Sequence, residues 1–172
     1  TGINMVLARK NKEDVEIRSS LCGVFNIYNI LAAISTGFEI GIKKNSIIAG
    51  PESMKGFGGR FEKIDHGPGP TVIVDYAHTP DGLENVLKTA KDILGQGGRL
   101  LSVFGCGGDR DRKKRKLMGA VSARIADFTI ITSDNPRSER PEDIIVMVEE
   151  GLKEESSKSY MTIIDRKEAI HH

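Results

Sequence analysis

Four clusters of polar and charged residues come directly after four apolar runs of this sequence. In chain order the clusters occupy residues 75–80, 105–112, 133–137 and 165–166. If the apolar runs are parallel strands, their carboxyl ends meet at one edge of a sheet, where loops and helix N-termini form a ligand crevice. We therefore expect all four clusters to lie at that edge and to contact a charged small molecule.

The cluster at 133–137 carries the groups that a zwitterionic ligand requires. Arg137 offers a fork of donors for a carboxylate, and Asp134 and Asn135 offer acceptors for an ammonium group. The same residues also suit an Asx-turn before a helix, with Pro136 as the turn former and Arg137 in solvent. The pattern alone leaves both interpretations open.

The cluster at 105–112 is a glycine-rich loop. Its glycines around Cys106 allow the backbone to approach a ligand closely, and residues 109–112 place both signs of charge at its rim. It matches neither the P-loop pattern nor the dinucleotide fingerprint. A tight turn from strand to helix explains it equally well, and Cys106 is expected to be a small packed residue rather than a nucleophile.

The cluster at 75–80 contains two further candidates. Asp75, at a strand end, suits either a ribose hydroxyl or the capping of the following turn. His78 suits a base, a phosphate contact or a structural histidine beside a helix cap.

The elements that must position these clusters alternate along the second part of the chain. Apolar runs at 71–75, 99–104, 128–132 and 160–165 are typical of buried strands. Helices are expected at 80–94, 114–126 and 141–152. Thr79 is the expected cap of the first helix, and the second is expected to bury Leu117, Val121 and Ile125. Asp165 and Glu168 form the expected capping box of a fourth helix. This alternation predicts an α/β fold: a Rossmann-like, mainly parallel sheet with helices on both faces.

The pattern before residue 60 is different. Extended segments at 3–8 and 14–18 precede an apolar helix at 25–37 and a short helix near Asn45, which is typical of the end of another domain. The glycine-rich stretch 54–59 is the expected linker. We predict one domain over residues 1–59 and another over residues 60–172.

Composition excludes several classes of protein. The 172 residues include 25 Lys and Arg against 24 Asp and Glu, a net charge of +1, and no Trp. The small charge and the scarcity of aromatics argue against nucleic-acid binding, and no apolar run or leader pattern indicates a membrane or export signal. Two distant cysteines suggest neither a disulfide framework nor a zinc site, so a cytoplasmic location is expected.

The motifs together resemble the C-terminal part of the Mur ligase family over nearly the whole chain. Six segments carry the resemblance in the family's order: GVFNIYNILAA at 23–33, GRFE at 59–62, DYAHTPDGLEN at 75–85, FGCGGDRD at 104–111, DNPR at 134–137 and DR at 165–166. The DNPR segment is similar to the signature of the members that add meso-diaminopimelate rather than lysine.

The resemblance implies an enzyme of three domains and assigns residues to two ligands. Residues 1–59 would end the central ATP-binding domain, and residues 60–172 would form most of the last domain, which delivers the amino acid. The expected ATP contacts are Asn29, Arg60 and Asp75, with His78 near the phosphates. The expected contacts to the amino-carboxylate end of meso-diaminopimelate are Arg110, Asp134, Asn135 and Arg137.

The chemistry implied by the resemblance is ligation in peptidoglycan precursor synthesis. ATP phosphorylates the D-glutamate carboxylate of UDP-N-acetylmuramoyl-L-alanyl-D-glutamate, the incoming amine attacks the acyl phosphate, and phosphate leaves. Mg²⁺ would bridge phosphate oxygens, and no metal ligand is expected in this segment. The family's P-loop and modified lysine would lie before Thr1, so this segment alone is expected to be inactive.

Two other hypotheses remain open on the sequence. One is a stand-alone nucleotide-binding or amino-acid-binding module of the same fold, and the other is a related ligase that adds a different amino acid. Because the helix at 25–37 is apolar on most sides, the isolated segment is also expected to self-associate. His171 and His172 are either native or the remnant of a tag.

Overall fold

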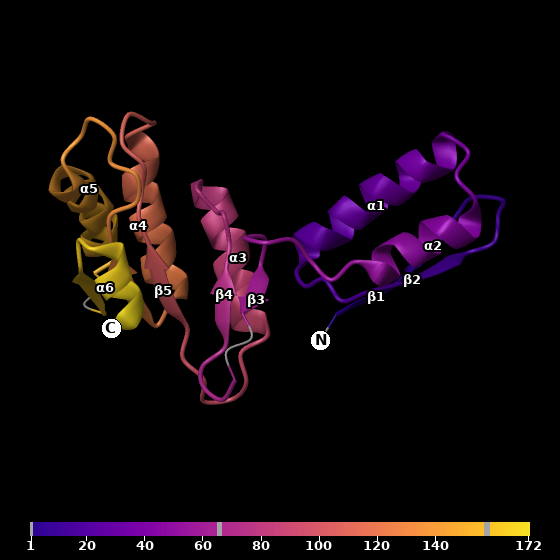
Figure 1. The fold of residues 1–172 in the computed structure, drawn as a ribbon, viewed down its shortest axis with the longest axis horizontal. Helices are drawn as coiled ribbons and strands as arrows, with labels where there is room; N and C mark the ends of the chain where they lie inside the picture. Colours follow the sequence, from indigo (N-terminus) through magenta and orange to yellow (C-terminus); the bar gives the residue numbers. More distant parts are fainter. Residues whose placement is uncertain (1, 65–66, 157–158) are drawn as a thin grey trace. The chain divides into compact units, whose positions relative to one another are not determined.

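The computed structural model describes residues 2–64, 67–156 and 159–172. The chain forms two compact units, residues 1–76 and 77–172, coloured from indigo to magenta and from magenta to yellow in Figure 1. The domain boundary at 59/60 stays a prediction.

The first unit is a helix pair on a small antiparallel sheet, followed by a hairpin. β1 (Ile3–Leu7) pairs with β2 (Val15–Ser19), and α1 (Val24–Glu39) and α2 (Lys44–Ser53) follow. Both strands and both helices fall where the sequence predicts them. In β2 alternate side chains are buried, as expected for a strand with one face on a core. That core consists of Ile3, Val15, Ile17, Ile30, Ile34 and Ile47.

The hairpin of the first unit corrects one prediction. The apolar run at 71–75 contains β4 (Val72–Val74), which pairs antiparallel with β3 (Glu62–Ile64) rather than joining the parallel sheet. Val72 and Val74 are 40% and 44% exposed, so the run is not a buried strand in this structure. The prediction failed because a continuous apolar run indicates a strand but specifies neither its partner nor how far it is buried.

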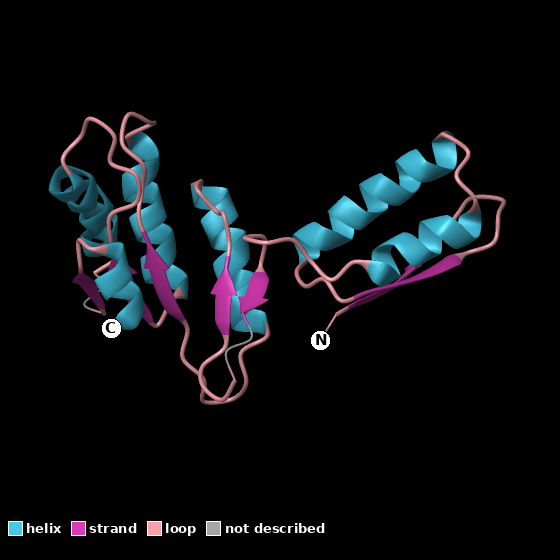
Figure 2. Ribbon diagram, viewed as in Figure 1, coloured by secondary structure: helices cyan, strands magenta, loops and turns pink. Residues whose placement is uncertain are grey.

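The second unit is an α/β layer, as predicted. Its elements are α3 (Pro80–Asp92), β5 (Leu101–Phe104), α4 (Lys113–Ile125), β6 (Phe128–Ile131), α5 (Pro141–Glu154), β7 (Tyr160–Thr162) and α6 (Arg166–His171), shown by type in Figure 2. β5, β6 and β7 form a parallel sheet in that order. The unit's core joins Phe104 and Ile131 of the strands to Met118, Val148 and Leu152 of the helices.

Local signals explain where two helices of this unit begin and which face a third one buries. The Thr79 side chain accepts a hydrogen bond from the Gly82 backbone N–H, which caps α3 before Pro80 as predicted. Asp165 caps α6 by accepting from the Glu168 N–H. In α5 the predicted apolar face of Ile144, Ile145, Val148 and Leu152 is buried.

The face of α4 differs from the prediction in part. Leu117 is 55% exposed, whereas Met118, Ala120 and Ser122 are buried. The reason is a close crossing of α4 and α5 at Gly119 and Gly151: a Cβ on Gly119 would overlap the Val148 carbonyl oxygen. Small residues on α4 therefore face the neighbouring helix, a signal that apolar periodicity does not register.

Within the described part of the chain, none of the helices is long and apolar enough to cross a membrane.

Candidate functional site

Two loops at the carboxyl edge of the parallel sheet form the centre of the candidate site. The 105–112 loop connects β5 to α4, and the 132–140 loop connects β6 to α5. Because β5 and β6 are adjacent, the loops lie together, and the Gly108 N–H donates to the Asn135 carbonyl oxygen at 2.9 Å. The structure thus brings together two of the four predicted clusters.

The glycines of the 105–112 loop make room for the second loop of the chain itself. A Cβ on Gly105 would be 3.0 Å from the Asp134 nitrogen, and one on Gly108 would overlap the Pro136 carbonyl. A Cβ on Gly107 would be 3.0 Å from Nη1 of Arg137. These contacts support the interpretation of this loop as a tight turn. Glycine is required because the two backbones approach so closely.

The four residues predicted to hold the amino acid lie on these two loops. Arg137 has a positive φ of 50° and donates through Nη1 to the Gly108 carbonyl oxygen, with its side chain exposed. The Asn135 Oδ1 atom accepts from the Arg137 N–H at 3.3 Å, which is the Asx-turn of the alternative interpretation. Arg110 and Asp134 are exposed. The structural and the ligand-binding interpretations are therefore compatible here, because the turn leaves charged groups at the surface.

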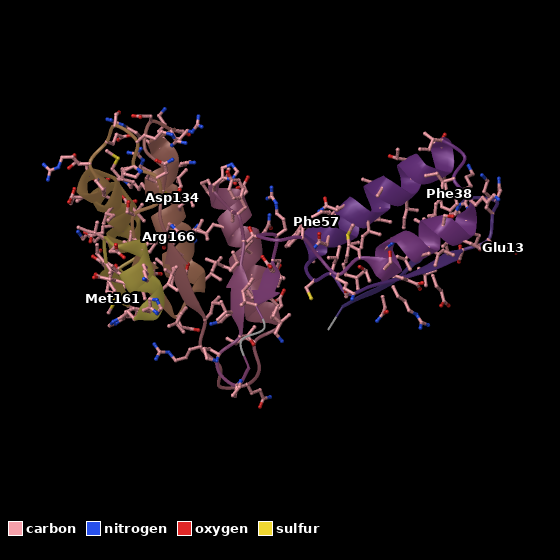
Figure 3. All side chains as sticks on the ribbon, in the orientation of Figure 1. Glu13, Phe38, Phe57, Asp134, Met161 and Arg166 are labelled. Carbon is pink, nitrogen blue, oxygen red and sulfur yellow. The ribbon has the colours of Figure 1, made fainter. Side chains whose placement is uncertain are left out.

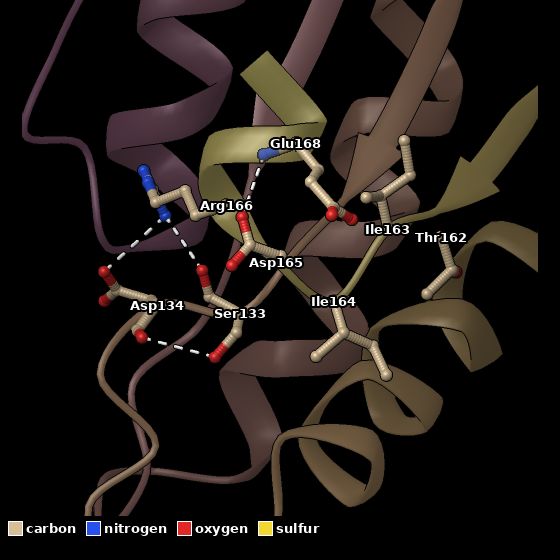
Figure 4. A pocket seen from close by; sticks show the side chains of 8 residues that line it. All are labelled: Ser133, Asp134, Thr162, Ile163, Ile164, Asp165, Arg166 and Glu168. Carbon is tan, nitrogen blue, oxygen red and sulfur yellow. Dashed lines mark hydrogen bonds and ion pairs between the residues drawn. The ribbon is translucent and has the colours of Figure 1, made fainter. Parts of the chain in front are cut away.

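Asp134 borders an open hollow of about 790 Å³ beside the third cluster. Nη1 of Arg166 lies 3.6 Å from Oδ1 of Asp134 and donates to the Ser133 carbonyl oxygen at 3.3 Å. Figure 3 labels Asp134 and Arg166 next to each other in the whole chain, and Figure 4 shows their contact from close by. The hollow is lined by Ser133, Asp134, Thr162, Ile163, Ile164, Asp165, Arg166 and Glu168. The 165–166 cluster thus lies at the same edge as the 132–140 loop, as predicted.

A buried ion pair beneath the loops is absent from the sequence predictions. The Arg115 side chain is fully buried, and its Nη1 and Nη2 donate to Oε2 and Oε1 of Glu139 at 2.8 and 2.7 Å. The Arg115 hydrogen bonds, and next the Asp109 N–H, lower the pKa of Glu139 to about 2. Arg115 lies in the charged run Lys113–Lys116, whose composition indicates a solvent-exposed segment. Only the position of Arg115 indicates that it is buried: it is three residues before the buried Met118, on the face of α4 that packs inward.

The three residues predicted to contact ATP lie in the first unit. The Phe61 N–H donates to Oδ2 of Asp75 at 2.7 Å, and the Arg60 guanidinium lies 5.3 Å from the centre of the Tyr76 ring. Asn29 donates to Oδ1 of Asn26 at 3.3 Å on the exposed side of α1. Arg60 precedes β3 and Asp75 follows β4, so the two residues lie on neighbouring arms of the same antiparallel hairpin.

The Phe61 ring packs edge-on against Phe25 in the first turn of α1, with ring centres 6.3 Å apart. This contact connects the turn that carries Arg60 to the helix that carries Asn29. All three predicted ATP contacts therefore belong to one connected region of the first unit.

The two remaining candidates, His78 and Cys106, make contacts within the protein itself. His78 is exposed, and its carbonyl oxygen accepts from Nζ of Lys114 at 2.8 Å. Cys106 is buried with its sulfur 3.7 Å from that of Met118, and burial raises the pKa of its thiol to about 11. It is the packed residue that the sequence predicts. Among the residues that the structure describes, no three His, Cys, Asp or Glu side chains are grouped to hold a metal ion.

The parallel sheet, with helices packed on it and two hydrogen-bonded loops at its carboxyl edge, defines a Rossmann-like α/β domain. The family model described as "Mur ligase, glutamate ligase domain" matches residues 59–172, and the chain belongs to the Mur ligase family.

Several relatives that share one name are similar to this chain over most of its length. The chain is 52% identical over 156 residues to the UDP-N-acetylmuramoyl-L-alanyl-D-glutamate–2,6-diaminopimelate ligase of Syntrophomonas wolfei and 52% identical over 160 residues to that of Bacillus cereus. These matches cover 91% and 93% of this chain and 32% of each relative. The chain therefore spans about a third of the length of these relatives.

Solved structures agree with this assignment. A ligase of the same name superimposes with a TM-score of 0.61 at 38% identity, covering 98% of this chain and 33% of that chain. UDP-N-acetylmuramate–alanine ligase from Thermotoga maritima gives 0.71 at 25% identity, covering 90% and 33%. The fold expected from the sequence is thus found in other members of the family.

Proposed function

We propose that this chain is the amino-acid-delivering part of an ATP-dependent, ADP-forming ligase of peptidoglycan precursor synthesis. The complete protein would join meso-diaminopimelate to UDP-N-acetylmuramoyl-L-alanyl-D-glutamate in the cytoplasm, with these small molecules and ATP as its partners. The names of the relatives support this substrate pair.

The observation that carries the proposal is the joining of the 105–112 and 132–140 loops at one sheet edge. A Cβ on Gly107 would be 3.0 Å from Nη1 of Arg137 and 3.9 Å from Cγ of Arg110, so these two side chains are neighbours, and Asp134 is an exposed residue of the same loop as Arg137. Paired cations and an acid in that arrangement suit an amino acid that carries both a carboxylate and an ammonium group. Asn135 would contribute its amide to the same ligand.

ATP would contact the first unit through Asn29, Arg60 and Asp75. An exposed guanidinium fork at Arg60 fits a phosphate, and the Asp75 carboxylate, already oriented by the Phe61 N–H, fits a ribose hydroxyl. His78 would lie near the phosphates. When bound, ATP would supply the phosphoryl group that activates the acceptor carboxylate, and Mg²⁺ would neutralise charge on its phosphates.

The test is an assay of ADP release by the complete natural protein, with UDP-N-acetylmuramoyl-L-alanyl-D-glutamate as acceptor. We expect meso-diaminopimelate to be used in preference to L-lysine. A preference for lysine, or for another amino acid, would contradict the assignment of Asp134 to Arg137. Absence of any ADP release would favour a binding module.

Arg137→Ala tests the carboxylate contact in the same assay. Loss of a hydrogen bond to a charged group costs about 1.5–3 kcal/mol, so we expect KM for meso-diaminopimelate to rise about tenfold or more, with KM for ATP unchanged. Arg140→Ala is the matched control, because Arg140 is an exposed arginine of the same loop whose Nε lies 3.7 Å from Glu142. Equal KM values in the two variants would refute the contact.

A further inference from the structure

Glu139 is the point at which the two loops and the start of α4 are joined. Its carboxylate accepts from Nη1 and Nη2 of Arg115, from the Asp109 N–H at 2.6 Å, and lies 3.1 Å from Nη2 of Arg112. Nη2 of Arg115 also donates to the Gly107 carbonyl oxygen at 3.2 Å. A single carboxylate of the 132–140 loop thus binds three positions of the neighbouring loop and helix.

A second set of hydrogen bonds connects the same loops beside Glu139. The Ser138 N–H and Oγ donate to Oδ2 and Oδ1 of Asp109 at 3.2 and 2.7 Å. Asp109 adopts a positive φ of 50° while making these bonds. Each loop therefore orients an acidic side chain of the other through its backbone, and the relative position of the loops is determined by several directional contacts.

The buried pair is a poor device for stability alone. Removing two charges from water is costly, and apolar residues of similar size often stabilise a fold equally well. Nε of Arg115 is buried and has no hydrogen-bond partner within residues 2–64, 67–156 and 159–172. A more specific role is consistent with such a pair, because its geometry is directional.

The residues that make or contact this pair are close in the sequence to groups that the proposed function uses. Arg110 follows Asp109 directly, and Arg137 precedes Glu139 by two residues. Resting on the proposed function, we propose that Arg115 and Glu139 are positioning residues that determine the distance between Arg110 and Arg137 and thereby the fit of the amino acid. Neither touches the substrate in this proposal, and both act through the backbone of the loops.

The test compares Glu139→Gln and Arg115→Lys in the complete protein. The glutamine cannot accept from both guanidinium nitrogens as a carboxylate does, and the lysine cannot bridge Glu139 and Gly107 with a planar fork. Because displacements of about 1 Å in a binding constellation cost up to roughly 100-fold, we expect KM for meso-diaminopimelate to rise about 10- to 100-fold. KM for ATP and for the UDP-linked acceptor should not change.

Matched controls use an ion pair on the surface. Arg124 lies 2.8 Å from Glu155 between α4 and α5, with side chains 49% and 36% exposed, so Glu155→Gln and Arg124→Lys make the same chemical changes away from the loops. We expect wild-type KM values for both. If the controls and the test variants behave alike, the positioning role is wrong.

A double variant separates positioning from folding. Arg115→Met with Glu139→Leu removes both charges, so neither is left buried without a partner. We expect a melting temperature near that of the wild type together with the raised KM for meso-diaminopimelate. A stable double variant with a wild-type KM would overturn the proposal.

Hydrogen exchange provides a measure that requires no substrate. The amides of Gly108, Asp109 and Ser138 donate across the two loops, so peptides covering 105–112 and 132–140 should exchange faster in Glu139→Gln than in the wild type. Unchanged exchange would refute the joining of the loops by Glu139. If instead the wild type adds lysine while exchange rises as expected, the proposed function fails and the joining of the loops stands.

Discussion

α4 and α5 cross so closely at Gly151 that a single added methyl group would separate them. An alanine Cβ at position 151 would overlap the Lys116 carbonyl oxygen and lie 2.7 Å from the Ala120 nitrogen, where ordinary contact begins at 3.4 Å. These atoms belong to the backbone and cannot rotate away. Gly151→Ala therefore forces the two helices apart by about 1 Å.

Two opposing terms determine the size of the effect. Alanine in place of glycine favours a helix by about 1 kcal/mol, and overpacking costs about 1–3 kcal/mol, occasionally more. Separation of the helices also loosens the contacts of Val148 and Leu152, which are fully buried. The overpacking cost is therefore expected at the upper end of this range, about 3 kcal/mol. We expect the free energy of unfolding to fall by about 2 kcal/mol, or roughly 10 °C in melting temperature for a domain of this size.

The measurement is urea unfolding followed by circular dichroism, with Gly50→Ala as control. Gly50 lies inside α2, directly before Pro51, and a Cβ there would meet nothing within 4 Å beyond its chain neighbours. The helix propensity of alanine, about 0.5–1 kcal/mol, is opposed there by the contact of its Cβ with the proline ring, so we expect a change in stability of less than about 1 kcal/mol. The two glycine-to-alanine changes should thus differ clearly in size. A Gly151→Ala protein as stable as the wild type would refute the interpretation of the crossing.

Three further outcomes are expected. Because the folded-state pKa of Glu139 is about 2 against an ordinary 4.5, its contribution to stability is present above pH 4.5 and lost as the pH falls toward 2; the unfolding free energies of the wild type and Glu139→Gln should differ at neutral pH and converge near pH 2. The raised pKa of Cys106 leaves its thiol protonated and buried, so iodoacetamide at neutral pH should label Cys22 first and Cys106 only after unfolding, as peptide mass spectrometry would show. Thr79→Ala removes the hydrogen bond from the Gly82 N–H and should lower the stability by about 1 kcal/mol, whereas Thr79→Ser should restore it; equal stability of both variants would contradict the cap.

Local signals made much of the second unit predictable. Thr79 and Asp165 cap helices because hydroxyl and carboxylate oxygens satisfy the first free N–H groups, and the face of α5 follows from a clear 3.6-residue period. The loops that carry Arg110 and Arg137 were located because loops at the carboxyl ends of adjacent parallel strands must meet.

Features that depend on distant partners were not predictable in the same way. Arg115 and Glu139 are 24 residues apart, and both belong to charge-rich segments that are typical of solvated surface. Val72 to Val74 has the composition of a buried strand, but nothing in this run specifies that its partner is β3. In each case the sequence shows the residue types, but it does not show which distant residue or strand each one contacts.

The backbone of Arg137 has a consequence for how this site tolerates change. Its φ of 50° lies in the left-handed region, which costs a side-chain-bearing residue about 1–2 kcal/mol and glycine almost nothing. Arg137→Gly should therefore relieve backbone strain while it removes the guanidinium. Under the proposed function, a mutant library selected for heat resistance alone would be drawn toward glycine at this position, and a library selected for substrate use would retain arginine. The two selections oppose each other at a single residue, so stabilisation of this domain has to be sought elsewhere.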